Sequence, residues 1–245
     1  MRIFIFFLAI YLVESFKIPD PLLSVTNLAT TKFITTKLNE LELEKNVTRK
    51  IVHITSAPTF IYTWQFYDSQ FWASCVPAVM LLLLITKNKK LSEIISRSGD
   101  INELGKGPAL YALVLYLVTL GFWKNDPIGI IAMNQLAIGD GFAEIIGKKY
   151  GKTKWLNSKK SVEGSMAFIL SSSFFTFFSL NIVTFFENSH KYSFQEILLI
   201  SIICSISEVY SKIDDNLSIP IAALITNYFI LFFKYYSFID PIVNN

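Results

Sequence analysis

Long apolar runs separated by short polar segments make up most of the chain after residue 50. A helix needs about 20 mostly apolar residues to cross a bilayer, and seven runs approach this length: 51–67, 71–87, 107–124, 127–147, 164–186, 194–211 and 218–239. No run shows the alternation of a membrane β-barrel strand, and in lipid a helix satisfies its own backbone. The pattern predicts an all-α, polytopic integral membrane protein with about seven transmembrane helices.

The basic residues test this arrangement, because cytoplasmic loops of membrane proteins carry an excess of Lys and Arg. If the seven runs cross the membrane alternately, 15 of the 22 Lys and Arg residues fall on one side, which we call side A. Side A holds Lys45, Arg49, Lys50, Lys87, Lys89, Lys90, Arg97, Lys106, Lys148, Lys149, Lys152, Lys154, Lys159, Lys160 and Lys212. The opposite side, side B, holds Lys124, Lys191 and Lys234. This imbalance supports the run count and predicts that side A faces the cytosol or an equivalent compartment.

Composition excludes several other classes of protein. Hydrophobic residues make up 52% of the chain and charged residues 17%, against about 45–50% and about 25% in soluble domains. Intrinsic disorder is excluded, because disordered chains are poor in aromatic residues and rich in charge, and this chain is the opposite. The two cysteines, Cys75 and Cys204, lie inside apolar runs and do not indicate a disulfide scaffold. The net charge of +3 does not favour nucleic acid as a partner, so the lipid bilayer is the partner that composition indicates.

The N-terminal residues have the composition of targeting segments. Residues 1–15 contain a short apolar run after Arg2, as a signal peptide does, and residues 16–44 begin rich in hydroxyl groups and poor in acids, as a transit peptide does. Together they resemble the bipartite leaders of plastids bounded by extra membranes. This predicts a membrane domain at 45–245, located in a plastid membrane. The alternative is an uncleaved signal anchor in the endoplasmic reticulum or another endomembrane.

Two acids inside the fourth apolar run are the first candidates for chemistry, since intramembrane acids are rare and usually functional. Asp140 and Glu144 lie one helical turn apart, on one face. The segment 148–160 follows directly and contains six lysines. Lysines bind phosphate and carboxylates bind magnesium, so the combination suggests a site for phosphates and a divalent cation. Two alternatives stay open. The acids could form a structural salt bridge to a lysine, and the loop could be basic only because it lies on the cytoplasmic side of the membrane.

Three further polar clusters are predicted on side A. Arg49 and Lys50 precede His53 at the start of the first run, segment 96–108 joins the second and third runs, and Glu208 precedes the triplet 214–216 (Asp-Asp-Asn) after the sixth. A lone histidine is more often packed or capping than catalytic, and such a triplet is usually a turn. Their convergence on one side of a small membrane domain nevertheless favours a shared site.

The motifs themselves resemble those of the phytol/farnesol kinase family of polyprenol kinases, relatives of dolichol kinases and CTP-dependent diacylglycerol kinases. The similar stretches are RKIVHI (49–54), SRSGDINELGKGPALY (96–111), PIGI (127–130), GDGFAEIIGKKYGKTKW (139–155), KKSVEGS (159–165) and DDNLSIP (214–220). Glu163 instead resembles the dolichol kinase pattern, and the residues that follow His53 also depart from the family. These departures bear on the choice of alcohol more than on the reaction.

The resemblance implies phosphoryl transfer from CTP, or UTP, to phytol or a related long-chain prenyl alcohol. The product would be a prenyl monophosphate that feeds tocopherol and prenylquinone synthesis, and Mg²⁺ would be the cofactor. Asp140 with Asp214 or Asp215 would hold the metal, and Glu144 or Glu208 would orient the alcohol hydroxyl. The residues expected to bind the nucleotide are Arg49, Lys50, Gly147, Gly151, Lys152, Lys154, Lys160 and Ser161.

Two other functions stay open at this point. A phosphatidate cytidylyltransferase shares the run of acid, glycines and lysine together with Glu163-Gly164, but its lysine-aspartate signature near the C-terminus is missing here. A transporter would place acids at mid-bilayer in several spans and often in repeated halves, whereas these acids lie near one face. The sequence leaves the alcohol, the nucleotide and the oligomeric state open.

Overall fold

The computed structural model describes residues 18–41, 44–86, 104, 107–183 and 191–243. The helices in this part are α2 (Asp20–Asn39), α3 (Lys45–Thr63), η1 (Trp64–Phe66), α4 (Gln70–Ile85), α6 (Gly107–Phe122), α7 (Ile128–Asn134), η3 (Gln135–Gly139), α8 (Asp140–Tyr150), α9 (Val162–Ile182), α10 (Phe194–Tyr210) and α11 (Asp215–Val243). Apart from one isolated bridge between Lys154 and Ser161, the described residues contain no β-structure. The expected all-α fold is confirmed.

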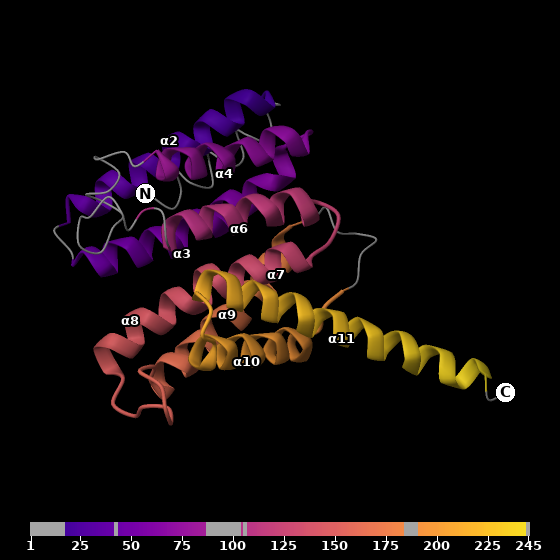
Figure 1. Ribbon diagram of the computed structural model, residues 1–245. Helices are drawn as coiled ribbons and strands as arrows, with labels where there is room; N and C mark the ends of the chain where they lie inside the picture. Colours follow the sequence, from indigo (N-terminus) through magenta and orange to yellow (C-terminus); the bar gives the residue numbers. More distant parts are fainter. Residues whose placement is uncertain (1–17, 42–43, 87–103, 105–106, 184–190, 244–245) are drawn as a thin grey trace.

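The helices form one bundle whose two halves follow the order of the chain (Figure 1). Helices α2, α3, α4 and α6 lie together, and helices α7 to α11 form the other half. Within these halves α8 packs along α9, α9 along α10, and α10 along α11, while α4 packs against α6. The C-terminal part of α11 extends beyond the other helices (Figure 1). The chain therefore brings the start of α3, the end of α8 and the start of α11 to one end of the bundle.

The core is continuous across both halves. Trp64 and Tyr67 at the end of α3, Phe168 of α9 and nearly all of α7 and η3 are buried in one apolar cluster. Polar side chains inside this core meet partners on neighbouring helices, as when Gln135 Nε2 donates to Ser201 Oγ at 3.0 Å. The segment α7–η3 is therefore the central element of the bundle, and it leads directly into Asp140.

Within the described residues, each of the seven apolar runs lies mostly on helical segments; residues 87 and 184–186 of these runs lie outside the described part. Two stretches in the described part of the chain are both long enough and apolar enough to cross a bilayer, namely α9 and residues 215–235 of α11, while α4 and α6 are apolar but shorter. Helix formation in the runs is thus confirmed, and their number as transmembrane spans stays a prediction. The outer faces of α4, α9 and α11 are strongly apolar, with Phe71, Phe174 and Phe233 more than half exposed.

Residues 20–39, which the sequence suggests as part of a leader, form α2 and pack on α3 and α4. The Asp20 carboxylate accepts hydrogen bonds from the backbone N–H groups of Asp68 and Ser69 at 3.0 and 2.8 Å. Buried Asn27 donates from Nδ2 to Thr63 Oγ1 and to the Tyr67 hydroxyl, both at 3.1 Å. The division at residue 45 stays a prediction, and a cleavage there would remove all of these contacts. Residues 1–17 lie outside the described part.

Candidate active site

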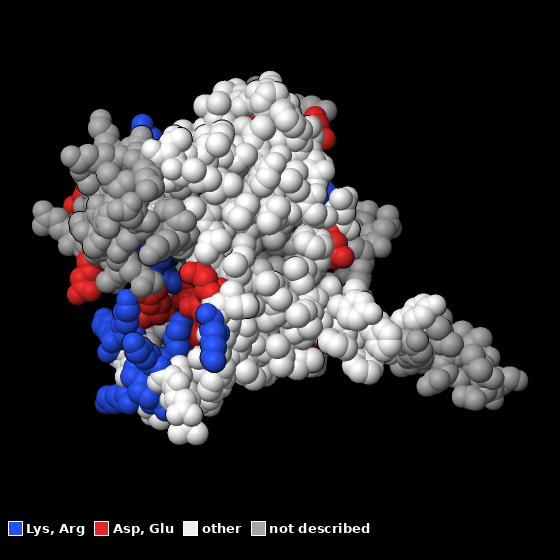
Figure 2. Space-filling model, in the orientation of Figure 1, with Lys and Arg blue, Asp and Glu red and all other residues white. Residues whose placement is uncertain are grey.

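A cavity of about 860 Å³ opens at the end of the bundle where α3, α8, α9, α10 and α11 meet. We call it the charged cavity, because six basic and five acidic side chains are among its lining residues in the described chain. Figure 2 shows this end as a group of Lys and Arg side chains around a red acidic patch, beside a surface that is mostly uncharged. The polar residues of side A thus gather into one concave site.

The first group of charges joins α3 to α8. Lys50 is buried and forms ion pairs with Asp140 and, at 2.9 Å between Nζ and Oε2, with Glu144. Arg49 Nη2 lies 3.1 Å from the same Glu144 oxygen, and Lys148 Nζ lies 2.5 Å from Glu144 Oε1. Glu144 is therefore surrounded by three cations. The expected bridge from the acids to a lysine exists, and it lies within the cavity wall.

The second group joins the loop after α8 to α10 and α11. Lys160 Nζ is paired with Glu208, whose side chain is only 2% exposed, and lies 2.9 Å from Asp215 Oδ2. Burial lowers the pKa of Lys160, but the Glu208 and Asp215 carboxylates outweigh it and hold the pKa above its usual value. Lys160 is consequently a permanent cation at physiological pH, placed between two acids.

The loop 151–161 positions Lys160 by folding back on itself. Trp155 N–H donates to the Lys160 carbonyl at 3.1 Å, and Val162 N–H donates to the Thr153 carbonyl at 2.9 Å. The turn at its tip uses Asn157 with φ of 57°, a left-handed conformation that asparagine tolerates better than most residues. Ser158 Oγ donates to the Val209 carbonyl of α10 at 3.1 Å. These bonds fix the basic loop over the acids of α10 and α11.

Small residues allow α8, the loop and α9 to meet closely. A Cβ on Gly164 would lie 2.9 Å from the Ala143 carbonyl oxygen, and a Cβ on Gly151 would lie 2.2 Å from the Gly147 carbonyl oxygen. Ser161 Oγ sits among these glycines and accepts a hydrogen bond from Gly164 N–H at 3.1 Å, which caps α9. These small residues therefore serve close packing, and Ser161 lies in the cavity wall.

The residues before Asp140 form a π-helix, η3, inside an otherwise α-helical segment. Such segments are rare and frequently occur at functional sites. Asp140 is the first residue of α8 and is 5% exposed, so the change of helical register comes directly before a buried acid of the cavity. No feature of the sequence alone indicates this π-helix.

The structure brings nearly all of the predicted site residues together. The lining of the charged cavity includes Arg49, Lys50, Asp140, Glu144, Gly147, Gly151, Lys154, Lys160, Ser161, Glu208, Asp214 and Asp215. Lys152 is exposed and lies outside this lining. Most of segment 96–108 lies outside the described residues. The individual roles assigned to these residues stay predictions.

Three acids lie close enough together to hold a metal, and two of them, Asp140 and Asp215, are among those expected from the sequence. Asp140, Glu208 and Asp215 each offer a carboxylate oxygen, and these oxygens lie within 4.8 Å of one another. Asp214 instead accepts hydrogen bonds on Oδ1 from the backbone and side-chain nitrogens of Asn216, at 3.0 and 2.7 Å, so it shapes the turn before α11. The sequence suggests Glu208 as a residue that orients the alcohol hydroxyl, not as a metal ligand. Only its position in the last turn of α10 could have indicated that it lies near the other acids.

Comparison with curated proteins finds similarity to plant proteins. It is 32% identical to "Probable phytol kinase 1, chloroplastic" of Oryza sativa subsp. japonica over 80% of this chain and 67% of that protein. It is 31% identical to "Probable phytol kinase, chloroplastic" of Triticum aestivum over 78% of this chain and 69% of that one. It is 30% identical to "Phytol kinase 1, chloroplastic" of Arabidopsis thaliana over 76% of this chain and 67% of that protein.

The chain belongs to the phytol kinase family. The resemblance drawn from the motifs is therefore confirmed at the level of the family. No family model matches the chain, and no solved structure matches it. The aligned share of about three quarters or more of the chain is large enough that this membership applies to the helical bundle and not to one motif.

Proposed function

We propose that this protein is a prenyl alcohol kinase of the phytol kinase type, which transfers the terminal phosphoryl group of CTP, or UTP, to phytol or a related isoprenoid alcohol. The observation that carries the proposal is the charged cavity, where Arg49, Lys50, Lys154 and Lys160 surround buried acids in a member of the phytol kinase family. A polyanionic donor and a metal both match this arrangement, because phosphoryl transfer depends mainly on positioning and charge neutralisation.

The acids provide suitable ligands for Mg²⁺, the proposed cofactor. Asp140, Glu208 and Asp215 offer hard oxygen atoms from three different helices, and magnesium prefers such ligands. Three carboxylates this close need a positive partner, and Lys50 and Lys160 supply it in this structure. When bound, the metal would neutralise charge on the phosphate oxygens. The three carboxylates thus fit Mg²⁺ as ligands, and the two lysines balance their charge in its place.

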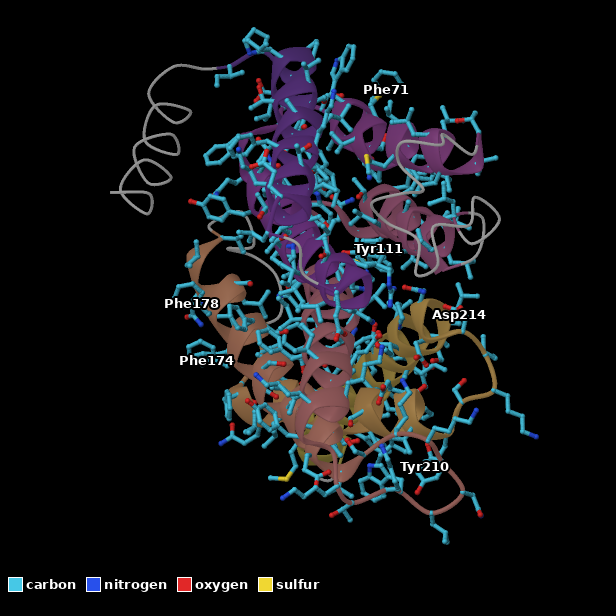
Figure 3. All side chains as sticks on the ribbon, turned by 90° about the vertical axis from the view of Figure 1, so that its left-hand side faces the viewer. Phe71, Tyr111, Phe174, Phe178, Tyr210 and Asp214 are labelled. Atoms are coloured by element: carbon cyan, nitrogen blue, oxygen red, sulfur yellow. The ribbon has the colours of Figure 1, made fainter. Side chains whose placement is uncertain are left out.

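The outer surface supports a membrane location for the reaction. Large apolar side chains of α4, α9 and α11 are exposed, among them Phe71, Phe174 and Phe178, which point outward in Figure 3. Soluble monomers rarely expose extended apolar patches. A lipid alcohol dissolved in the bilayer could reach the bundle from these faces, while the charged cavity faces water. The relatives named chloroplastic support a plastid membrane as the location. The prenyl monophosphate would feed tocopherol and prenylquinone synthesis, as the resemblance to the family implies.

The reaction is tested with the purified full-length chain in lipid nanodiscs, with Mg²⁺, phytol, farnesol or geranylgeraniol, and CTP, UTP, ATP or GTP. A kinase transfers label from the γ-phosphate of the nucleotide to the lipid and releases a nucleoside diphosphate. A cytidylyltransferase would transfer label from the α-phosphate and release pyrophosphate instead. Label from the α-phosphate in the lipid, or no label from any nucleotide, would overturn the proposal.

Asp140→Asn tests the place of the reaction, because it keeps the shape of the side chain and removes its charge. We expect turnover to fall by about 100-fold or more, the scale of losing one electrostatic contact in a transition state. Glu196→Gln is the matched control, since Glu196 lies at the start of α10 and bonds to Ser193 and Lys234. Its capping box tolerates glutamine, so turnover should stay close to that of the wild type.

Two lysines of the same loop provide a test of nucleotide binding. Lys154 lines the charged cavity and Lys152 does not. Lys154→Met should therefore raise the KM for the nucleotide about tenfold, as expected for a lost charge-assisted contact, while Lys152→Met should leave it within about twofold. Equal effects of both substitutions would contradict the placement of the triphosphate in the cavity.

A further inference from the structure

A second, smaller cavity adjoins the charged cavity. It has a volume of about 90 Å³, lies between α3, α4 and α6, and is lined mostly by apolar side chains, including Val52, Phe60, Val76, Met80, Leu84 and Leu115. We call it the apolar cavity. The two cavities share Arg49, Gly107, Pro108 and Asn216 in their linings. They are therefore adjacent, one charged and the other apolar.

His53 lines the apolar cavity and faces the charged one. It follows Lys50 by one helical turn on α3, and its Nε2 lies 3.9 Å from Asp140 Oδ2. The residue is 7% exposed, and Nε2 is buried with no hydrogen-bond partner. Most buried polar atoms are paired, whereas His53 Nε2 is one of ten buried side-chain nitrogen and oxygen atoms in the described chain that are not, and it lies beside an acid of the charged cavity.

The position of the imidazole is set from its other side. The Tyr111 ring of α6 lies against it with 3.7 Å between ring centroids, and the Tyr111 hydroxyl donates to the His53 carbonyl at 3.1 Å. Figure 3 shows Tyr111 in the interior, between the two halves of the bundle. The ring is thus held in one orientation, with Nε2 at the boundary between the apolar and charged linings.

We propose that the apolar cavity binds the hydroxyl-bearing end of the isoprenoid alcohol, and that His53 Nε2 accepts a hydrogen bond from this hydroxyl. The inference rests on the proposed function and adds where the alcohol enters and which atom orients it. The only polar atom of such an alcohol is its hydroxyl, which can donate to the unpaired His53 Nε2. The other unpaired nitrogen among the lining residues, Arg49 Nε, is a donor and cannot accept this bond. A cavity of about 90 Å³ is small beside the about 300–1,000 Å³ of sites that enclose a drug-sized ligand. The rest of the isoprenoid tail would therefore extend outward past α4 and α6.

Filling the cavity tests the binding of the alcohol. Ala112 of α6 lines it, and Ala109, one turn earlier on the same helix and similarly buried, does not. We expect Ala112→Leu to raise the KM for phytol by about tenfold or more, the scale of added methylene groups in a tight apolar pocket, with the nucleotide KM unchanged. Ala109→Leu introduces the same crowding and should not change the phytol KM selectively. Equal effects of both variants, or a change in the nucleotide KM alone, would overturn the proposal.

Substitutions of His53 test the hydrogen bond. His53→Leu should lower kcat/KM for phytol by about 100-fold, as expected for a misplaced reacting group, while binding of a fluorescent CTP analogue stays at the wild-type affinity. His53→Gln places an amide near the position of Nε2 and should restore most of the lost activity. Loss of nucleotide binding in His53→Leu, or no rescue by His53→Gln, would show that the residue is only structural.

A photoreactive alcohol separates this inference from the proposed reaction. An isoprenoid alcohol with a diazirine in the isoprene unit nearest the hydroxyl is incubated with the full-length chain in nanodiscs and irradiated, with excess phytol as competitor. Competed labelling at Val76, Met80 or Leu115 supports the cavity even if no nucleotide yields a phosphorylated lipid, in which case the proposed function fails alone. Phosphoryl transfer with competed labelling elsewhere would overturn the cavity and leave the reaction intact.

Discussion

The ion pair between Lys160 and Glu208 should be a main determinant of how the basic loop sits on the bundle. Glu208 is almost completely buried, whereas the Lys160 side chain keeps 37% of its exposure. Replacing Lys160 by methionine keeps the length of the side chain and leaves a buried carboxylate without its main counter-charge. Removing one partner of a buried pair typically destabilises a protein by about 3–5 kcal/mol. Because water screens the exposed part of Lys160, we expect a loss near the lower end, about 3 kcal/mol.

The assay is a double-substitution cycle of Lys160→Met, Glu208→Gln and both together, with the free energy of unfolding measured by chemical denaturation in detergent micelles. The doubly substituted protein has no unpaired buried carboxylate at position 208. Its loss of unfolding free energy should therefore be smaller than the sum of the two single losses by about 2 kcal/mol. Lys152→Met in the same loop is the control, and it should change the stability by no more than about 0.5 kcal/mol.

Two results would refute this reasoning. If the two single losses add to within about 0.5 kcal/mol, the pair is not coupled, and the hydrogen bonds of the loop alone determine its position. If Lys152→Met destabilises the protein as much as Lys160→Met does, the effect belongs to the charge of the loop as a whole.

Three further predictions concern stability. Gly164→Ala should destabilise the protein by about 1–3 kcal/mol, because the new Cβ would crowd the α8 backbone, while Gly121→Ala in open space should stabilise it by about 0.5 kcal/mol; both are measured by denaturation in micelles. Asn27→Ala should cost about 1–3 kcal/mol, since Thr63 and the buried Tyr67 lose their hydrogen-bond donor. Exposed Thr26→Ala is the control in thermal scans. The folded-state pKa of Lys160 is raised, so its stabilising effect should be fully present below its usual pKa of 10.5 and fade as the pH rises through the raised value. Unfolding titrations of the wild type and Lys160→Met between pH 7 and the alkaline transition should therefore converge at high pH.

The apolar pattern predicted most of the helices because their length and hydrophobicity depend little on tertiary contacts. The fourth run became α7, η3 and α8, and the positions of α9, α10 and α11 follow the last three runs. Helix α2 was not separated from a leader, because its Ser and Thr residues resemble a transit peptide. In the structure such polar groups join helices, as Ser24 Oγ does when it donates to the Trp72 carbonyl at 2.8 Å. That use of a hydroxyl depends on residues 48 positions away, which a local pattern does not contain.

The candidate site was predictable as a set of residues and much less as a set of contacts. Sorting charges by side was enough to group Arg49, Lys50, Asp140 and Glu208. The rotation of each helix, which decides that Lys50 pairs with Asp140 and that Lys160 pairs with Glu208, arises only from packing over distances of 90 and 48 residues in the chain. The unpaired nitrogen of His53 likewise depends on α4 and α6 enclosing an apolar cavity, so its chemistry could not be distinguished from packing in the sequence.

The charges of the cavity also indicate how a donor nucleotide would enter it. The acids at its base already hold Lys50 and Lys160 in ion pairs, so the same lysines that would bind phosphates now neutralise the carboxylates. Bringing a polyanion alone against Asp140, Glu208 and Asp215 would place like charges together in a buried site, which is strongly unfavourable. A divalent cation on these acids would release the lysines to the phosphate oxygens, so metal and nucleotide should bind with positive coupling. Measuring the affinity for a fluorescent CTP analogue with and without Mg²⁺ checks this: the gain should be large in the wild type and much smaller in Asp140→Asn, and equal gains in both proteins would contradict the exchange of ion pairs.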